Sequence, residues 1–222
     1  MEKILENTFR NINIGLANEM AILCNKMGID VWEVIDAAAT KPYGFMPFYP
    51  GPGLGGHCIP IDPFYLTWKA REYNYHTKLI ETAGEINNSM PDFVVHRCME
   101  ILNKEGKALN GSNILVLGVA YKKDIDDYRE SPVIPILQQL DKCGAHWTVV
   151  DPHVQEFKYN QTICSVNNQL SHKDLTEADL VLIATDHSTF DYELIAKYAK
   201  VIFDTRNSPV KNYLKDDEYY KL

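Results

Sequence analysis

The sequence predicts an α/β protein in two parts, an all-helical domain over residues 1–106 and a doubly wound parallel α/β domain over residues 107–222. In the first half, apolar residues recur every three or four positions, which is the period of an amphipathic helix. In the second half, short and wholly apolar runs alternate with helical patterns, as in strands buried on both faces of a parallel sheet. A dense run of prolines and glycines over residues 40–60 indicates one long irregular loop within the helical part.

The first expected element is a long helix over residues 2–27 that ends at Gly28. Asp30, with Glu33 three residues later, forms a capping-box pattern for a shorter second helix. The apolar stripe of the long helix consists of Leu5, Phe9, Ile12, Leu16, Met20, Leu23 and Met27. No partner of comparable size is evident in the helical half, so the stripe favours a contact with a second subunit, with burial by residues 80–102 of the same chain as the alternative.

The loop comes next, and its composition separates it from both neighbours. Residues 40–60 hold five prolines and five glycines, a density that neither helices nor strands tolerate. A loop of this length within a compact domain is usually functional or disordered, and its aromatic residues favour an ordered, buried loop. Asp62–Pro63 then begins a third helix, because proline suits the first helical turn. Helical patterns continue over residues 80–90 and 93–102.

The second half is predicted from its apolar runs. These predict strands over residues 113–119, 147–150, 180–184 and 201–203. A helix over residues 131–143, ended by Gly144, separates the first two strands. Lys122 and Lys123 follow the first strand, at the carboxyl edge where open α/β sheets bind ligands.

Composition and charge exclude several function classes. A formal net charge of −8 over 222 residues argues against a general surface for nucleic acid or for an anionic membrane. No stretch reaches the roughly 18 consecutive apolar residues that span a bilayer, and the N-terminus lacks a signal-peptide pattern. The five cysteines include no CxxC pair, which fits a reducing compartment without a disulfide framework or a metal site. We therefore expect a cytoplasmic protein with no nucleic-acid, membrane or metal partner.

One glycine-rich motif invites a dinucleotide-binding interpretation. Residues 51–56 satisfy the pattern G-x-G-x-x-G, but that pattern works only where a strand enters and a helix leaves. Here Pro50 precedes the motif and Pro60 follows closely. The glycines favour another use, in which a backbone without Cβ atoms lies directly against a ligand.

Cys58 ends this glycine loop and is a candidate nucleophile. It lies just before the helix that begins near Asp62, where the helix dipole and unpaired N–H groups favour a thiolate. A buried, inert cysteine is the alternative from spacing alone. A cysteine hydrolase or acyltransferase that uses His57 and Asp62 is a further alternative, although adjacent residues rarely form such a pair.

Four blocks of residues resemble the UDP-glucose/GDP-mannose dehydrogenase family. Residues 50–63 match its active-site pattern Gly-Gly-x-Cys-x-x-x-Asp. Lys3 with Asn7, residues 119–132, and residues 203–207 match further blocks in the same order and spacing. The resemblance covers nearly the whole chain and is strongest to the branch that oxidises UDP-N-acetylhexosamines, with UDP-N-acetylglucosamine favoured. It implies a helical dimerisation domain followed by a Rossmann-like, UDP-binding domain.

The resemblance implies oxidation of a sugar C6 hydroxyl to a carboxylate with two NAD, a reaction that supplies surface polysaccharides. Cys58 would carry a thiohemiacetal and then a thioester. The implied catalytic residues are Cys58, Lys3, Asn7 and Asp62, those for substrate are Tyr49, Gly51, Gly53, Leu54, Gly55, Tyr121, Lys122 and Arg206, and that for cofactor is Arg129. Lys3 and Asn7 lie one helical turn apart and can face one oxyanion. Without the resemblance they would be solvated helix residues, and Asp62 a helix cap.

The family holds NAD in an N-terminal Rossmann domain, whereas this sequence begins at the long helix. We expect the isolated chain to lack the NAD site and to reduce no NAD. It is interpreted as a fragment of a full enzyme, with a split-gene product that uses a separate NAD-binding domain, or a UDP-sugar-binding remnant, as alternatives. The family also pairs subunits through the long helix, which implies a homodimer.

Overall fold

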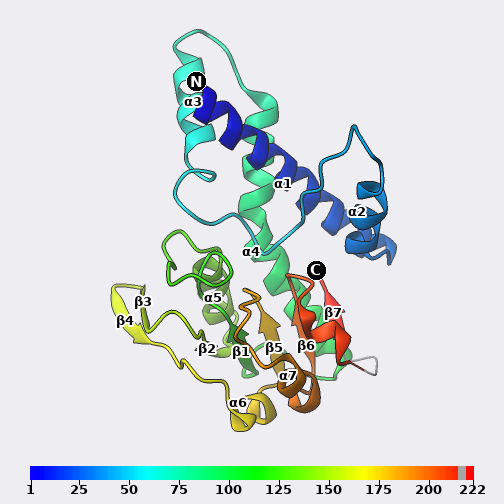
Figure 1. Cartoon of the computed structure of the whole chain (residues 1–222). Helices are drawn as coiled ribbons and strands as arrows, with labels where there is room; N and C mark the ends of the chain where they lie inside the picture. Colours follow the sequence, from blue (N-terminus) through cyan, green and yellow to red (C-terminus); the bar gives the residue numbers. More distant parts are fainter. Residues whose placement is uncertain (215–218) are drawn as a thin grey trace. The chain divides into compact units, whose positions relative to one another are not determined.

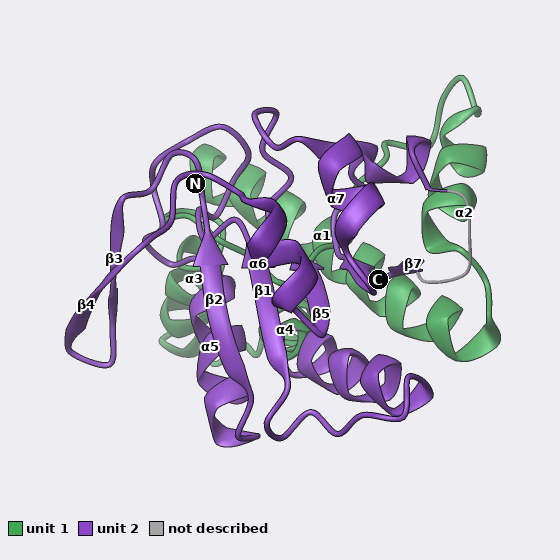
Figure 2. Cartoon of the chain, turned by 90° about the horizontal axis from the view of Figure 1, so that it is seen from below, with its two compact units in different colours: residues 1–90, 222 green, residues 91–221 purple. Residues whose placement is uncertain are grey.

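The computed structural model describes residues 1–214 and 219–222, and the chain divides into two compact units (Figure 2). Unit 1 comprises residues 1–90 with Leu222, and unit 2 comprises residues 91–221. The division falls inside one helix, whereas the sequence places a domain boundary near residue 106. In the described part of the chain, no helix is long and apolar enough to cross a membrane.

Unit 1 is built from helices around one irregular segment (Figure 1). The helices are α1 (Glu2–Met27), α2 (Val31–Ala39), α3 (Asp62–Arg71) and the first part of α4 (Lys78–Lys104), up to residue 90. Gly28 ends α1 in the left-handed conformation with φ 69°. The Asp30 carboxylate begins α2 by accepting hydrogen bonds from the N–H groups of Trp32 and Glu33. These local signals explain why both helix ends agree with the sequence.

Helix α4 is longer than the sequence pattern indicates. The two stretches expected over residues 80–90 and 93–102 form one helix, with Pro91 inside it. Proline removes one helical hydrogen bond, and such a gap is tolerated where packing holds the helix on both sides. Val94, Cys98 and Ile101 are fully buried beyond that proline. The part of α4 that begins at Pro91 belongs to unit 2.

Unit 2 is a parallel five-stranded sheet in the order β2-β1-β5-β6-β7. Its strands are β1 (Asn113–Leu117), β2 (His146–Val150), β5 (Leu180–Ile183), β6 (Ile202–Asp204) and β7 (Tyr219–Lys221). The chain builds outward from β1 to β2 and then from β5 to β7, so the strand order reverses between β1 and β5. Doubly wound sheets bind ligands at the carboxyl edge beside such a reversal.

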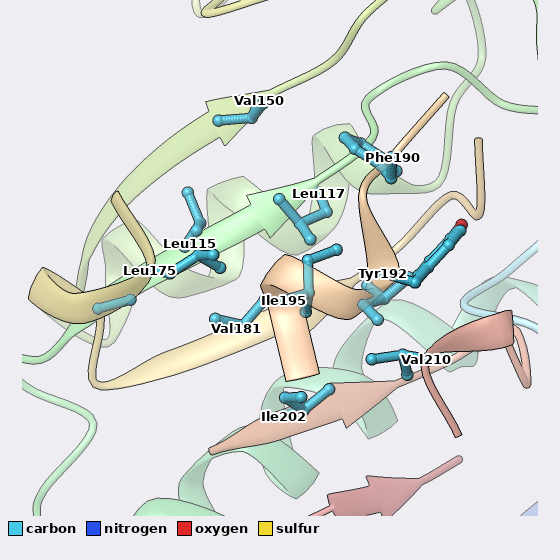
Figure 3. Packing of buried hydrophobic residues seen from close by; sticks show 12 residues of the cluster. Leu115, Leu117, Val150, Leu175, Val181, Phe190, Tyr192, Ile195, Ile202 and Val210 are labelled. Atoms are coloured by element: carbon cyan, nitrogen blue, oxygen red, sulfur yellow. The ribbon is translucent and has the colours of Figure 1, made fainter. Parts of the chain in front are cut away.

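Helices cover this sheet as a doubly wound fold requires. They are α5 (Val133–Lys142), α6 (His172–Glu177) and α7 (Tyr192–Tyr198), with a short 3₁₀ turn, η1 (Pro209–Asn212). Figure 3 shows Ile195 of α7 directed toward Leu117 and Val181 of the sheet, which belong to one buried cluster. Ile114 and Val116 alternate with the cluster residues on β1 and are also buried, so both faces are covered. The predicted fold class is confirmed.

A small hairpin was not predicted from the sequence. Strands β3 (Glu156–Tyr159) and β4 (Thr162–Ser165) pair antiparallel as a separate two-stranded sheet. Asn160 and Gln161 both have positive φ, 44° and 68°, as a two-residue hairpin turn requires. Asparagine suits that conformation but glutamine is unusual there, so the usual Asn-Gly signal is absent.

Candidate functional site

Cys58 lies in the last turn of the glycine loop, directly before α3, and is exposed. Its carbonyl oxygen accepts hydrogen bonds from the N–H groups of Ile61, at 3.2 Å, and Asp62, at 2.9 Å. Gly53 and Gly56 have φ values of 138° and 86°, which side chains rarely permit. The loop backbone therefore needs glycine at these two positions, and it leads to the exposed Cys58.

Three of the four predicted catalytic residues come together beside this turn. The Asn7 amide donates to Asp62 Oδ2 at 2.6 Å. Lys3 Nζ lies 3.9 Å from the same oxygen. Ile61, not Asp62, is the N-cap of α3, so the capping alternative for Asp62 is not supported. Lys3 and Asn7, one turn apart on α1, thus converge on a carboxylate whose residue is hydrogen-bonded to the Cys58 backbone.

Tyr49 and Gly51 anchor the glycine loop to the helices. The Tyr49 hydroxyl donates to Asp36 at 2.7 Å, and its ring stacks on Trp32 with centroids 5.6 Å apart. The hydrogen bond to Asp36, together with burial, raises the pKa of Tyr49. The buried Gly51 N–H donates to the Asn18 side-chain oxygen at 3.0 Å. Their expected contact with substrate stays a prediction.

A chain of buried amides behind Gly51 was missed by the sequence reasoning. Asn18 donates to Asn87 on α4 at 2.8 Å, and Asn87 donates to the backbone and side-chain oxygens of Asn11 at 3.0 Å. Asn18 and Asn87 are at most 1% exposed. The available signal was the spacing of Asn7, Asn11 and Asn18, which places polar residues along one side of α1.

Replacing Asn18 with alanine is expected to lower the free energy of unfolding by about 1–3 kcal/mol, because the Gly51 N–H and the Asn87 side chain lose a buried partner. Urea unfolding followed by circular dichroism measures the change. Asn13→Ala is the matched control, since its amide makes only an exposed bond to the Phe9 carbonyl. Equal stability of the two variants would show that the amide chain does not hold the loop.

Unit 2 carries the predicted cationic residues at the carboxyl edge of its sheet. Lys122 is exposed and has no ion-pair partner among the described residues, whereas Lys123 Nζ lies 3.5 Å from Asp186. Arg206 follows β6, and its Nε donates to the Ala184 carbonyl at 2.8 Å. Burial lowers the pKa of this guanidinium. The edge thus brings an accessible lysine and an oriented arginine to the ends of β1 and β6.

Arg129 is bound to its own loop in this structure. Its Nε and Nη2 donate to the two carboxylate oxygens of Asp127 at 2.9 and 2.8 Å. The hydrogen bond and the charge of Asp127 raise the pKa of Arg129. A role toward a cofactor would require the exchange of this pair for another anion, and it stays a prediction.

Asp151, at the end of β2, was not singled out from the sequence. It is fully buried and accepts five hydrogen bonds at 2.8–3.1 Å, from the N–H groups of Val119, Ala120, His153 and Val154 and from His187 Nε2. Burial acts to raise its pKa, but the bonds from His187 and the backbone outweigh burial and lower the pKa to about 2.

The turn after β1 does not form a dinucleotide-binding site. In Rossmann folds the N–H groups that follow the first strand bind a pyrophosphate. Here the N–H groups of Val119 and Ala120 point to Asp151, whose carboxylate takes the place of an external anion. An added Cβ at Gly118 would lie 2.5 Å from the Thr185 Cβ, so this turn is also closely packed. The described residues of unit 2 therefore do not fit NAD in the Rossmann manner.

Asp124, His153 and His187 have potential metal-ligand atoms within 4.8 Å of one another. The Asp124 N–H donates to His187 Nδ1 at 2.9 Å, and the Asp124 carboxylate accepts from the N–H and hydroxyl of Ser188 at 2.7 Å. His187 Nδ1 and the Asp124 carboxylate are thus already engaged in hydrogen bonds that hold the loop after β1.

The fold and the site together define a class of two-unit α/β protein. In unit 1, helices surround a glycine loop that carries an exposed cysteine. In unit 2, a parallel sheet carries Lys122 and Arg206 at its carboxyl edge. The comparisons with known proteins refine this class. Residues 1–89 match the central domain of the UDP-glucose/GDP-mannose dehydrogenase family, and residues 115–209 match the UDP-binding domain of the same family. The chain belongs to the UDP-glucose/GDP-mannose dehydrogenase family.

The relatives that the chain matches are named as dehydrogenases of two different UDP-N-acetylhexosamines. The chain is 36% identical to a UDP-N-acetyl-D-mannosamine dehydrogenase of Methanococcus maripaludis, over 93% of this chain and 47% of the relative. It is 34% identical to a UDP-N-acetyl-D-glucosamine 6-dehydrogenase of Pseudomonas aeruginosa, over 97% of this chain and 50% of the relative. The chain thus spans about half the length of these curated relatives.

The solved structures agree with this assignment. The UDP-D-ManNAc dehydrogenase of Pyrococcus horikoshii superimposes with a TM-score of 0.81 at 33% identity, over 98% of this chain and 50% of the other. The family and the fold implied by the sequence motifs are therefore confirmed.

Proposed function

We propose that this chain supplies the thiol-bearing and UDP-binding parts of a NAD-dependent UDP-sugar 6-dehydrogenase. The convergence of Lys3 and Asn7 on Asp62, at the turn that carries Cys58, is the observation that supports it most. The substrate class is a UDP-N-acetylhexosamine, whose C6 hydroxyl is oxidised to a carboxylate. Two NAD molecules in succession, held by a separate NAD-binding domain, would each accept one hydride.

Cys58 divides the oxidation into two stages. In the first stage the C6 alcohol would lose a hydride to one NAD and its hydroxyl proton to solvent, which gives an aldehyde. The Cys58 thiolate adds to the aldehyde carbon, a C–S bond forms, and the oxygen takes up a proton to give a thiohemiacetal. In the second stage the thiohemiacetal would lose its C6 hydride to the second NAD and its hydroxyl proton to solvent, which leaves a thioester. Water then attacks the thioester carbon, the C–S bond breaks, and the thiol regains its proton as the carboxylate is released. Exposure of the thiol at the start of α3 suits a group that must reach a substrate carbon.

Asp62, Asn7 and Lys3 assist these steps. The Asp62 carboxylate can orient the attacking water and accept its proton, as a general base does. Lys3 is 71% exposed at its side chain, so its ammonium group is available to an oxyanion at the reacting carbon. Asn7 holds the carboxylate in place through its hydrogen bond. The contacts of Asn7 and Lys3 with Asp62 support the dehydrogenase assignment.

The substrate contacts are assigned within each unit by itself. Tyr121, Lys122 and Arg206 would bind the UDP group, and Gly53, Leu54 and Gly55 would lie against the substrate. UDP-N-acetylglucosamine is the substrate we favour, and UDP-N-acetylmannosamine is the one to compare with it. Near-isosteric sugars differ by only a few kcal/mol in their contacts, so turnover must decide between them.

Lys122→Ala is expected to weaken UDP binding to the chain by about tenfold, because an accessible ammonium group that pairs with phosphate contributes on the order of 1–2 kcal/mol. Isothermal titration calorimetry with UDP measures the dissociation constant. Lys123→Ala is the control, since Lys123 already pairs with Asp186. A larger loss of UDP affinity in Lys123→Ala than in Lys122→Ala would mean that Lys123, and not Lys122, pairs with the phosphate. A wild-type chain that binds no UDP would contradict the UDP-binding part of the proposal.

A homodimer is also proposed, through the apolar side of α1. Leu5, Leu16 and Met27 are between 57% and 70% exposed, which is high for large apolar residues on a long helix. A second copy of the chain would cover this stripe. Light scattering coupled to size-exclusion chromatography measures the mass in solution.

A further inference from the structure

We infer that Asp151 and His187 are positioning residues for the loop of residues 119–124, which carries Tyr121 and Lys122. The inference rests on the proposed role of this loop in UDP binding. Neither residue needs to touch the nucleotide. Their effect would be to fix both ends of the loop before the ligand arrives.

Asp151 holds the first end of the loop. Its Oδ2 accepts from the N–H groups of Val119 and Ala120 at 2.8 and 3.0 Å. Its Oδ1 accepts from the N–H groups of His153 and Val154, which follow β2. A fully buried carboxylate with this many donors is strongly held, because every unmade bond would leave a buried polar group unpaired. The segments that follow β1 and β2 are therefore tied to one side chain.

His187 holds the second end. Its Nδ1 accepts the Asp124 N–H at 2.9 Å, so the ring proton lies on Nε2, which donates to Asp151 Oδ2 at 3.1 Å. The ring is fully buried, and its own backbone is fixed because the Tyr192 hydroxyl donates to its carbonyl at 2.9 Å. A neutral histidine thus joins Asp124 to Asp151, and both ends of the loop depend on the same pair.

Two further hydrogen bonds order the backbone between the two ends of the loop. The Thr185 hydroxyl donates to the Ala120 carbonyl at 2.6 Å, and the Tyr121 N–H donates to the Asp127 carbonyl at 3.0 Å. The backbone of the loop is thereby ordered, while the Lys122 side chain stays exposed. A loop that is ordered before binding does not pay the entropic cost of becoming ordered when UDP binds. Loss of the Asp151 and His187 hydrogen bonds should therefore weaken UDP binding, although no contact between the chain and UDP is removed.

The test compares His187→Leu with His187→Gln in the 222-residue chain. Leucine fills much of the space but makes neither bond, whereas the glutamine amide can both accept from Asp124 and donate to Asp151. His187→Leu should weaken UDP binding about tenfold by calorimetry and raise hydrogen exchange about tenfold or more at the amides of residues 119, 120 and 124. His187→Gln should remain within about threefold of the wild type on both measurements.

Leu175→Ala is the control for a general loss of stability, because Leu175 is fully buried on α6 and touches the core cluster but none of the loop bonds. It should unfold more easily yet keep wild-type UDP affinity and loop exchange. A folded His187→Leu chain with wild-type affinity and exchange would overturn the inference, and so would an equal loss in Leu175→Ala. If the wild type binds no UDP, the proposed function fails on that point, and exchange at residues 119, 120 and 124 decides the positioning role alone.

Discussion

Cys58→Ser, in the chain combined with an NAD-binding domain that restores turnover, is expected to lower the rate of carboxylate formation by on the order of 10³-fold or more. Serine preserves the shape, but its hydroxyl is far less ionised than a thiol and is a poorer nucleophile at neutral pH. The first oxidation, to the aldehyde, does not require the C–S bond. The measurement is the rate of UDP-uronate formation, followed by chromatography beside NADH absorbance.

Cys143→Ser is the matched control for this result. Cys143 is a free, half-buried cysteine of unit 2 that follows α5, far in sequence from the glycine loop. It should leave turnover unchanged. If Cys58→Ser forms the uronate at a wild-type rate, Cys58 does not carry the acyl group, and the exposed position of the thiol needs another explanation.

Asp151→Ala is expected to destabilise unit 2 by about 3–5 kcal/mol, because five donors lose their acceptor in a fully buried place. Equilibrium unfolding in urea measures the difference. Asp126→Ala, which changes an exposed acid of the same loop region, should stay within about 0.5 kcal/mol of the wild type. If Asp151→Ala lowers the free energy of unfolding as little as Asp126→Ala does, the Asp151 hydrogen bonds contribute little net stability.

The pH dependence of stability provides a second readout of the same residue. The folded-state pKa of Asp151 is about 2, below its ordinary value of 3.8. A depressed carboxyl pKa stabilises the fold above the unfolded pKa, and this contribution is lost as pH falls through the folded pKa. About 2 kcal/mol of stability should therefore disappear between pH 4 and pH 2 in the wild type. Asp151→Asn should lack this part of the acid transition.

The sequence predicts most of the architecture because the signals at element ends are local. Gly28, Asp30 and Pro63 each act on the turn that contains them, and the structure places a helix end at each. Apolar runs similarly predict β1, β2, β5 and β6. The hairpin of β3 and β4 escapes detection because Gln161 hides its turn, and β7 because Tyr219–Lys221 is a short edge strand without an apolar run.

Long-range hydrogen bonds explain what the sequence left out of the site. Asp151 bonds to residues up to 36 positions away, and Asn18 joins Gly51 to Asn87, which is 69 positions from it. No local spacing reveals such partners. Asp62 was found because the family motif marks it, but its pairing with Asn7 and Lys3 emerges only in the folded chain.

The thioester on Cys58 is the feature of the proposal that one measurement tests most directly. The Asp62→Asn chain, combined with an NAD-binding domain and given UDP-N-acetylglucosamine, should hydrolyse the thioester slowly and accumulate it. After an acid quench, peptide mass spectrometry should find the nucleotide-sugar acyl group on the peptide that contains Cys58. An acyl group on another residue, or continued uronate formation with Cys58 unmodified at every time point, would contradict the account.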